Sequence, residues 1–310
     1  MKIYGCRTSM HPGRREFIAS AFALGGAAAT SGGCTCMRGE ESPLVRFGMV
    51  ADIHYADRDS FGPCHFRESL GRLDEAVAVF NRRSLDFAIE LGDFKDMSSD
   101  RQSTVACLDA VEASFSKFRG PRHHVPGNHD FDCLEPSEFF SRISNGGQPA
   151  SGRYFFDVNG VRFIVLDGCH DSSFRHYSCA NPWDDSNIPP EQLQWLSRVL
   201  RDGTGPVVVF CHQRLDPGAE PRHLVRNAET VRAVLERSGR VRTVITGHQH
   251  SGGYAVCRGI VYYTLAALVD CGDEGSSSFA EADVFADGTV AVKGWQRAAS
   301  CARLRVDVKF

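Results

Sequence analysis

The sequence predicts an α/β fold whose C-terminal part consists of antiparallel strand pairs. Apolar runs typical of strands alternate with amphipathic helical patterns over residues 45–250, whereas only strand patterns follow residue 253. With 42% hydrophobic and 24% charged residues, the 310-residue chain has the composition of an ordinary globular protein. We therefore expect residues 45–310 to form a single domain.

The first half of this domain is expected to contain three strands and two helices. The first strand lies in LVRFGMVADIHY at 44–55, and apolar residues at spacings of three and four predict a helix over 66–83. LDFAIELGD at 85–93 gives the second strand, and a second helical pattern covers 102–118. The third strand, in HHVPGNH at 123–129, is short and ends in a turn.

A hairpin opens the second half. YFFDVNGVRFIVLDG at 154–168 has two aromatic and β-branched runs around an Asn-Gly turn. After an aperiodic loop at 168–188, PPEQLQWLSRVL begins a helix with Pro in its first turn. GPVVVFCH at 205–212 is apolar throughout, as in a strand buried on both faces. A helix over 227–238 and a strand over 240–248 complete this part.

Two further strand pairs are expected at the end of the chain. GYAVCRGIVYYTLAAL at 253–268 is expected to contain the first, and FAEADVFADGTVAVKGW at 279–295 the second, around an Asp-Gly turn. Such adjacent pairs are antiparallel.

Composition weighs against several classes of function. The 35 basic and 38 acidic residues form no basic stripe, so nucleic-acid binding gains no support. The chain has no run of 18 or more apolar residues, so no transmembrane helix is predicted. The 12 Cys are scattered without a CxxC pair, and zinc-finger spacing is absent.

Residues 1–36 have the pattern of an export signal. Basic residues, including Arg14 and Arg15, precede a small-residue apolar run at 17–29, and RREFI resembles a twin-arginine signal. We expect a linker at 37–44, export by the twin-arginine machinery, and a final location in the periplasm or on the extracytoplasmic membrane face. SGGC resembles a lipoprotein cleavage box without its usual large aliphatic residue, so a lipid anchor on Cys34 stays an alternative.

Five expected strands end in polar clusters. These are ADIH, LGD, PGNHD, FCH and TGHQH, at 51–54, 91–93, 126–130, 210–212 and 246–250. In open α/β sheets, sites form beyond the carboxyl ends of strands. The side chains that meet there would be Asp52, His54, Asp93, Asn128, His129, His212, His248 and His250. Imidazoles and hard oxygens in this number indicate two metal ions that share a carboxylate.

Each cluster is a weak signal alone, because a Gly-Asp pair is a common turn and a single His is usually bonded to a backbone carbonyl. We therefore expect structural roles for the six remaining histidines that follow the N-terminal segment: His65, His123, His124, His170, His176 and His223.

The ordered series DxH, GD, GNHD, H and GHxH resembles the calcineurin-like metallophosphoesterase superfamily, from residue 45 to about 270. The resemblance implies a β-sandwich flanked by α-helices, with the site at strand ends. It implies one metal on Asp52, His54 and His250, a second on Asn128, His212 and His248, and a bridging Asp93. It also implies that His129 protonates or stabilises the leaving oxygen and that Asp130 orients His129.

The chemistry implied is hydrolysis of a phosphate ester or pyrophosphate. Two ions can clamp the attacking and leaving oxygens and acidify the water shared between them, so that hydroxide attacks phosphorus. Mixed nitrogen and oxygen ligands suit Mn, Fe or Zn.

The segments FGMVADIHYAD and GHQHSGGYAVCRGIVYYTLAALVD resemble the manganese-dependent ADP-ribose/CDP-alcohol diphosphatases, some of which have Gln where His54 stands. This favours manganese and a phosphorylated small molecule, such as a nucleotide, as substrate. One alternative is an exported phosphomonoesterase or phosphodiesterase of broad specificity. A non-catalytic metal-binding surface protein is disfavoured, because such relatives usually lose a ligand.

Substrate contacts are expected from loops next to the motifs. Arg214 suits bidentate contact with a phosphate. The other candidates are Tyr55, Phe61, His65, Arg67, His170, Tyr177 and Trp183. For each of these, packing or surface exposure without a substrate role is the alternative.

Overall fold

The computed structural model describes residues 41–147, 151–270 and 277–303. The export signal expected over 1–36 and the lipid anchor considered for Cys34 therefore lie outside the described residues.

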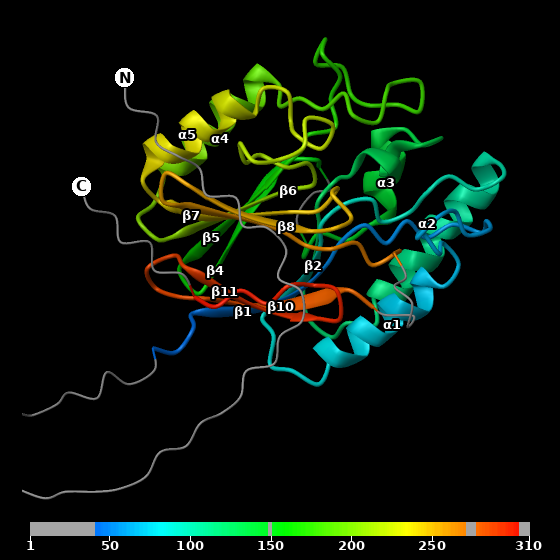
Figure 1. The fold of residues 1–310 in the computed structure, drawn as a ribbon, viewed down its shortest axis with the longest axis horizontal. Coiled ribbons are helices and arrows are strands. Elements are labelled where there is room, and N and C mark those ends of the chain that lie inside the picture. Colours follow the sequence, from blue (N-terminus) through cyan, green and yellow to red (C-terminus); the bar gives the residue numbers. More distant parts are fainter. Residues whose placement is uncertain (1–40, 148–150, 271–276, 304–310) are drawn as a thin grey trace, which may run out of the picture.

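Two sheets stack face to face (Figure 1). The first has the order β11-β10-β1-β2-β3 and contains β1 (Val45–Val50), β2 (Phe87–Glu90), β3 (Arg122–His124), β10 (Phe279–Val284) and β11 (Val290–Trp295). The second has the order β4-β5-β6-β7-β9-β8 and contains β4 (Tyr154–Val158), β5 (Val161–Leu166), β6 (Val207–Cys211), β7 (Val241–Thr246), β8 (Gly253–Cys257) and β9 (Ile260–Thr264). Strands β1, β2 and β3 are mutually parallel, as are β5, β6, β7 and β9.

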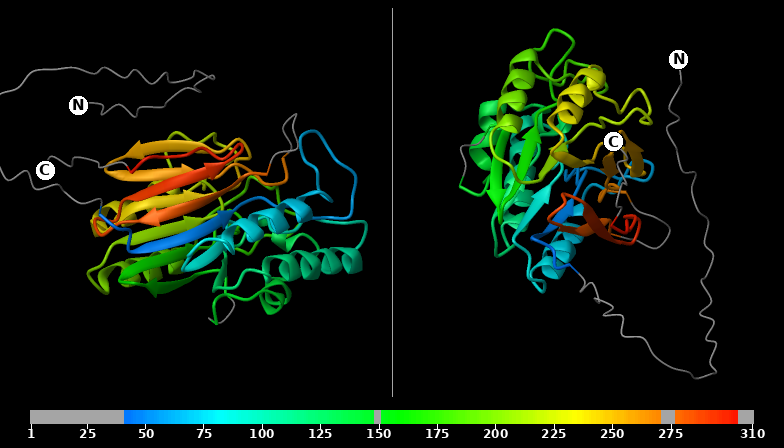
Figure 2. Two further views of the ribbon diagram at one scale, coloured as in Figure 1. Left: turned by 90° about the horizontal axis from the view of Figure 1, so that it is seen from below. Right: turned by 90° about the vertical axis from the view of Figure 1, so that its left-hand side faces the viewer.

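Helices cover the outer face of each sheet (Figures 1 and 2). The helices are α1 (Ser69–Phe80), α2 (Arg101–Phe115), α3 (Pro136–Arg142), α4 (Pro190–Arg201), α5 (Ala228–Ser238) and the short 3₁₀ helix η1 (Asn128–Phe131). Helices α1 to α3 pack with the first sheet, and α4 and α5 with the second. Within the described residues, no helix combines the length and apolarity required to cross a bilayer.

Aromatic side chains fill the space between the sheets. Phe47 of β1 stacks on Phe87 of β2 with ring centroids 4.8 Å apart, and it meets Phe163 and Phe210 of the second sheet edge-on at 5.8 Å each. Such edge and offset contacts are the favoured geometries of buried aromatic rings. The expected β-sandwich flanked by α-helices is therefore confirmed.

The long periodic segments were predicted best. The helices expected at 66–83 and 102–118 are present but shorter, and the Asn159–Gly160 hairpin turn has φ angles of 48° and 81°, as its sequence predicts. Two elements were missed. Helix α3 has 7 residues, too few for a clear period, and η1 replaces the simple turn expected after β3.

Candidate dinuclear metal centre

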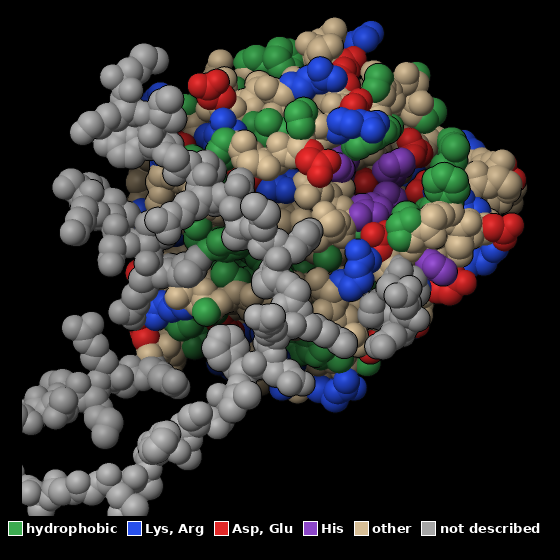
Figure 3. Space-filling model, viewed as in Figure 1, with side chains coloured by type: hydrophobic (Ala, Val, Ile, Leu, Met, Phe, Trp, Pro, Cys, Tyr) green, Lys and Arg blue, Asp and Glu red, His purple; other side chains and the backbone are tan. Residues whose placement is uncertain are grey.

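Side chains that follow five strands converge at one edge of the sandwich. The strands are β1, β2 and β3 of the first sheet and β6 and β7 of the second, and in each sheet these strands are parallel. Parallel strands present their carboxyl ends at the same edge, so loops distant in sequence meet there. Figure 3 shows His side chains gathered beside acidic ones on this face.

The first group consists of Asp52, His54 and His250, whose ligand atoms lie within 4.8 Å of one another. The Nε2 atoms of His54 and His250 are 3.2 Å apart, and Asp52 Oδ1 lies 3.9 Å from His250 Nε2. Asp52 is fully buried. A buried carboxylate facing two imidazole nitrogens is a donor set that fits Mn, Fe or Zn.

The second group consists of Asp93, His212 and His248, and Asp93 also faces the first group. Asp93 Oδ2 lies 3.1 Å from His212 Nε2 and 3.4 Å from His54 Nε2, so this one oxygen faces both groups. His248 Nδ1 is 3.0 Å from His212 Nε2. The position of Asp93 is therefore that of a ligand bridging two ions.

The surroundings of the Asn128 amide indicate whether the second group fits a metal ion. Its side chain is 1% exposed, and neither its Oδ1 nor its Nδ2 makes a hydrogen bond within the described part of the chain. Leaving such groups unpaired in the interior costs about 1–3 kcal/mol, so buried amides normally have partners. An ion held by Asn128, His212 and His248 accounts for the free amide oxygen.

The backbone at the centre is strained. Asp52, His54, Asp93 and His248 have φ angles of 51°, 45°, 55° and 65°. Non-glycine residues rarely occupy this left-handed region, and the cost is of order 1–3 kcal/mol each. All four strained residues are predicted ligands. The strain is therefore offset by the rest of the fold, which holds these side chains in place.

Glycine is required beside two of the ligands. A Cβ atom on Gly127 would lie 2.1 Å from the backbone nitrogen of Asp93, and one on Gly92 would lie 2.5 Å from His212 Nδ1. Gly127 therefore lets the GNHD segment approach Asp93, and His129 donates its backbone N–H to Asp93 Oδ1 at 2.8 Å.

Three ligating histidines have a partner on their second ring nitrogen. These contacts are His54 Nδ1 with Asp96 Oδ2 at 3.1 Å, His250 Nδ1 with Asp270 Oδ1 at 2.9 Å, and His212 Nδ1 with the Leu91 carbonyl at 2.8 Å. Such partners fix the ring orientation and the tautomer of metal-ligating histidines. Sequence reasoning missed Asp96 and Asp270 as orienting groups, because neither belongs to a motif.

Charges at the centre shift several pKa values. Burial opposes ionisation of Asp93, but the nearby imidazoles, His212 foremost, hold its pKa well below the usual range. Burial also opposes charging of His212, yet Asp93 raises the pKa of His212 to about 9. Asp270 similarly outweighs burial and raises the pKa of His250 to about 11. The Asp93 carboxylate is therefore ionised at neutral pH, as its predicted role as a ligand requires.

The predicted leaving-group residue, His129, lies at the surface of the centre. Its side chain is 30% exposed, and its ring is 5.0 Å from that of His54. Its Nδ1 contacts Asp132 Oδ2 at 2.7 Å. Burial disfavours its charged form, but Asp93 and Asp132 raise the pKa of His129 to about 9. The other ring nitrogen can therefore carry a proton at neutral pH.

Asp132, and not Asp130, contacts the ring of His129 in the structure. Side chains three residues apart eclipse one another in a 3₁₀ helix, which places Asp132 beside His129 and turns Asp130 inwards. Asp130 is fully buried and accepts backbone N–H groups of Gly127, Asp93, Phe94 and Lys95. Asp130 therefore holds the loop that carries Asp93.

Two amide substitutions separate these roles. Asp130→Asn places an NH₂ group against backbone donors, so we expect a loss of about 1–3 kcal/mol in the free energy of unfolding and reduced metal content. Asp132→Asn should keep the melting temperature and the metals but lower kcat. Calorimetry, metal analysis and kinetics on both variants check this. If Asp130→Asn were as stable as wild type and only its kcat fell, the result would indicate that Asp130 orients His129.

The two arginines proposed for substrate contact are already paired with carboxylates. Arg214 is 5% exposed, bonds both oxygens of Asp216 at 2.9 and 2.8 Å, and donates to Gln249 at 2.6 Å. It thus holds the residue between His248 and His250 and does not point a free guanidinium at substrate. Arg67 is exposed and pairs with Asp57 and Asp59 at 2.5 and 2.7 Å.

The aromatic candidates divide into buried and accessible groups. Tyr55 packs partly buried against the core beneath α1 and α2, and Tyr177 is 5% exposed within the same core. Phe61 is 81% exposed. Trp183 lies with its ring 5.5 Å from that of the ligand His248. Phe61 and Trp183 are therefore the accessible aromatic candidates near the centre.

The remaining histidines have varied surroundings. His123 stacks on Phe156 at 3.6 Å, and His124 contacts Glu90 at 3.0 Å, so these two have the structural roles expected of them. His65 Nδ1 lies 3.3 Å from the Ser60 hydroxyl, and the ring of His223 lies 5.3 Å from that of His248. His170 and His176 face Asp167.

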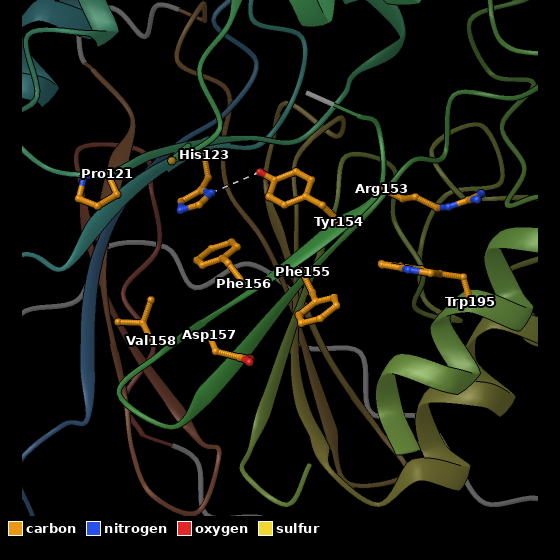
Figure 4. A pocket seen from close by; sticks show the side chains of 10 residues that line it. Pro121, His123, Arg153, Tyr154, Phe155, Phe156, Asp157, Val158 and Trp195 are labelled. Atoms are coloured by element: carbon orange, nitrogen blue, oxygen red, sulfur yellow. Dashed lines mark hydrogen bonds between the residues drawn. The ribbon is translucent and has the colours of Figure 1, made fainter. Parts of the chain in front are cut away.

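A cavity of about 550 Å³ lies elsewhere, next to strand β4. Figure 4 shows His123, Tyr154 and Phe156 on one side of it and Arg153 with Trp195 on the other. None of the predicted metal ligands lines this cavity, so it does not belong to the centre.

Comparison with known proteins identifies the class. Residues 45–252 match the family model for calcineurin-like phosphoesterases, which covers more than half of the chain. The chain therefore belongs to the calcineurin-like phosphoesterase family, and it is a metal-dependent hydrolase with a site for two divalent ions.

The relatives are consistent with this assignment. The manganese-dependent ADP-ribose/CDP-alcohol diphosphatase of Arabidopsis thaliana is 29% identical over 298 residues, which cover 82% of this chain and 95% of the plant protein. The protein of the same description from Oryza sativa subsp. japonica is 29% identical over 290 residues, covering 79% and 89%. A dimetal phosphatase from Danio rerio has the same fold, with a TM-score of 0.74, 24% identity and coverage of 84% and 99%.

Proposed function

We propose that this phosphoesterase hydrolyses the pyrophosphate bond of nucleotide-like molecules such as ADP-ribose or a CDP-alcohol. The observation that carries the proposal is the convergence of the predicted ligands around Asp93, with His129 beside them, in a chain whose relatives are named for these substrates. Two ions at the centre would supply an activated water and neutralise the phosphoryl oxygens.

The side chains of the chain supply the rest of the chemistry. Asp52, His54, His212, His248 and His250 would hold the ions, and all of these but the half-buried His250 are buried. Asp132 keeps the Nδ1 side of His129 occupied, so the exposed Nε2 side can donate a proton to the leaving oxygen.

Aromatic rings at the edge of the centre provide places for a nucleobase. Phe61 exchanges backbone hydrogen bonds of 3.0 Å with Cys64, whose Sγ is 4.0 Å from His250 Nδ1. Trp183 lies beside His248 at the second group. Exposed rings near phosphate chemistry stack well on bases, because every base has an apolar face.

The test is a comparison of four substrates on manganese-loaded protein. ADP-ribose, CDP-choline, a nucleoside monophosphate and bis-p-nitrophenyl phosphate are assayed together, with Asp93→Asn as the inactive control. Release of AMP and CMP from the first two at the highest kcat/KM supports the proposal. Preference for the last two would make the protein a broad phosphatase, and no turnover despite bound metal would favour a binding protein.

Phe61→Ala probes the base contact. Losing a stacking partner worth about 1–3 kcal/mol should raise KM for ADP-ribose roughly tenfold while kcat changes little. Phe61→Tyr should behave as wild type, and Phe155→Ala serves as a matched control, since Phe155 is 37% exposed on β4. If Phe61→Ala and wild type had equal KM values for ADP-ribose, Phe61 would not contact the substrate.

We also propose export through residues 1–36 by the twin-arginine machinery, supported by RREFI and the apolar run that follows it. Cell fractionation should find the protein outside the cytoplasm. Replacing Arg14 and Arg15 together by Lys should retain it inside. If the double variant were found in the same fraction as wild type, residues 14 and 15 would not be part of an export signal. Fractionation of Cys34→Ala tests the lipid anchor in the same way.

A further inference from the structure

The loop that follows β5 contains a second cluster of metal-ligand side chains. Asp167 stands at the end of β5, and the loop folds back so that His170 and His176 form a backbone bridge. His176 Nε2 lies 3.4 Å from Asp167 Oδ2, and His170 Nδ1 lies 3.8 Å from Asp167 Oδ1. One ligand atom from each of the three residues lies within 4.8 Å of the others.

We propose that Asp167, His170 and His176 bind a further divalent ion, zinc in preference, separate from the dinuclear centre. Tetrahedral zinc with bonds of about 2.0–2.1 Å holds neighbouring ligand atoms about 3.3–3.4 Å apart, close to the spacing observed here. Two imidazoles and one carboxylate are an established zinc donor set, with a fourth position left for water.

The unpartnered nitrogens support an ion at this place. His170 Nδ1 and His176 Nε2 are both buried, and neither makes a hydrogen bond within the described part of the chain. His176 Nδ1 faces the Tyr177 carbonyl at 3.3 Å, which places the proton of a neutral ring on Nδ1. The lone pair of Nε2 then faces a carboxylate, an arrangement that is repulsive unless a cation lies between them or the ring gains a second proton.

A simple ion pair explains less of the geometry. A protonated His176 could pair with Asp167, but His170 Nδ1 would still face the same carboxylate without a partner. Asp167 is 5% exposed, so water reaches the cluster only in part. One ion satisfies all three side chains at once.

The place of the cluster suggests what the ion does. The ring of His176 packs edge-on against Phe131 at 4.3 Å, and Phe131 is the last residue of η1, which carries Asn128 and His129. Further along the same loop, Trp183 lies beside His248. The ion would therefore fasten the loop that connects the two sides of the dinuclear centre.

Metal content tests this inference. The protein is stripped with a chelator, reloaded with zinc, freed of excess metal and measured by elemental analysis. The double variant His170→Ala/His176→Ala should hold one equivalent less than wild type, and His65→Ala should match wild type. Equal zinc content in the double variant and wild type would overturn the proposal.

Four further variants distinguish loss of the site from misfolding and from failure of the dinuclear assignment. Asp93→Asn/His250→Ala, which damages the dinuclear centre, should retain one zinc that the added changes His170→Ala and His176→Ala remove. His176→Cys, which supplies another zinc ligand, should keep the rise in melting temperature on adding zinc, whereas His176→Gln should lose it. If zinc raised the melting temperature of wild type and His176→Gln equally, the site would be ruled out.

Discussion

Replacing Asp93 by Asn is expected to lower kcat on the order of a thousandfold, equivalent to about 4 kcal/mol of transition-state stabilisation. Asp93 Oδ2 faces His54 on one side and His212 on the other, and Asp93 Oδ1 accepts the backbone N–H of His129. Asn keeps the shape and one oxygen, but it removes the negative charge, and its NH₂ group has to replace one of these two oxygens.

The measurement is kcat on a pyrophosphate substrate together with metal content. Asp283→Asn is the matched control, because Asp283 is an exposed carboxylate paired with Arg46 on the first sheet. The control should behave as wild type. Turnover by Asp93→Asn at the wild-type rate would contradict the bridging role.

Replacing His129 by Ala is expected to keep both metals and to lower kcat about 10²–10⁴-fold, the usual contribution of a general acid. The loss should be greatest for substrates whose leaving group has a high pKa, because those need the proton most. The reason is geometric: His129 is 30% exposed, and its Nδ1 is occupied by Asp132.

Metal analysis and a series of leaving groups check this prediction. His54, Asp93 and His129 also lie close enough together to hold an ion, so His129 has a competing assignment as a ligand. Loss of metal from His129→Ala would establish that assignment. Equal losses of kcat for good and poor leaving groups would exclude proton donation to the leaving oxygen.

The convergence of the candidate ligand side chains could be predicted because each of them follows a recognisable strand. An apolar run followed by Asp, Asn or His can be recognised in the sequence. Parallel strands bring their carboxyl ends, and the residues that follow them, to one edge of the sheet. The long helices could also be predicted, because their periodicity extends over several turns. The sandwich was expected from the family resemblance.

Contacts made by returning loops could not be predicted in this way. Asp270 meets His250 only because the chain turns back after β9. Arg214 was expected to be free for phosphate, but Asp216, two residues along the same loop, folds back onto it. The contact of His129 with Asp132, and not with Asp130, depends on η1, a single 3₁₀ turn that the sequence of GNHD does not distinguish from a simple turn.

The shared position of Asp93 is tested most directly by titrating metal-free protein with manganese and recording electron paramagnetic resonance spectra. Two manganese ions that share a bridging carboxylate are magnetically coupled, so the wild-type spectrum should change from that of isolated ions to that of a coupled pair as the centre fills. Asp93→Asn should not show the coupled spectrum. If the fully loaded wild type showed only isolated ions, the convergence of five strand ends on one dinuclear centre would be contradicted.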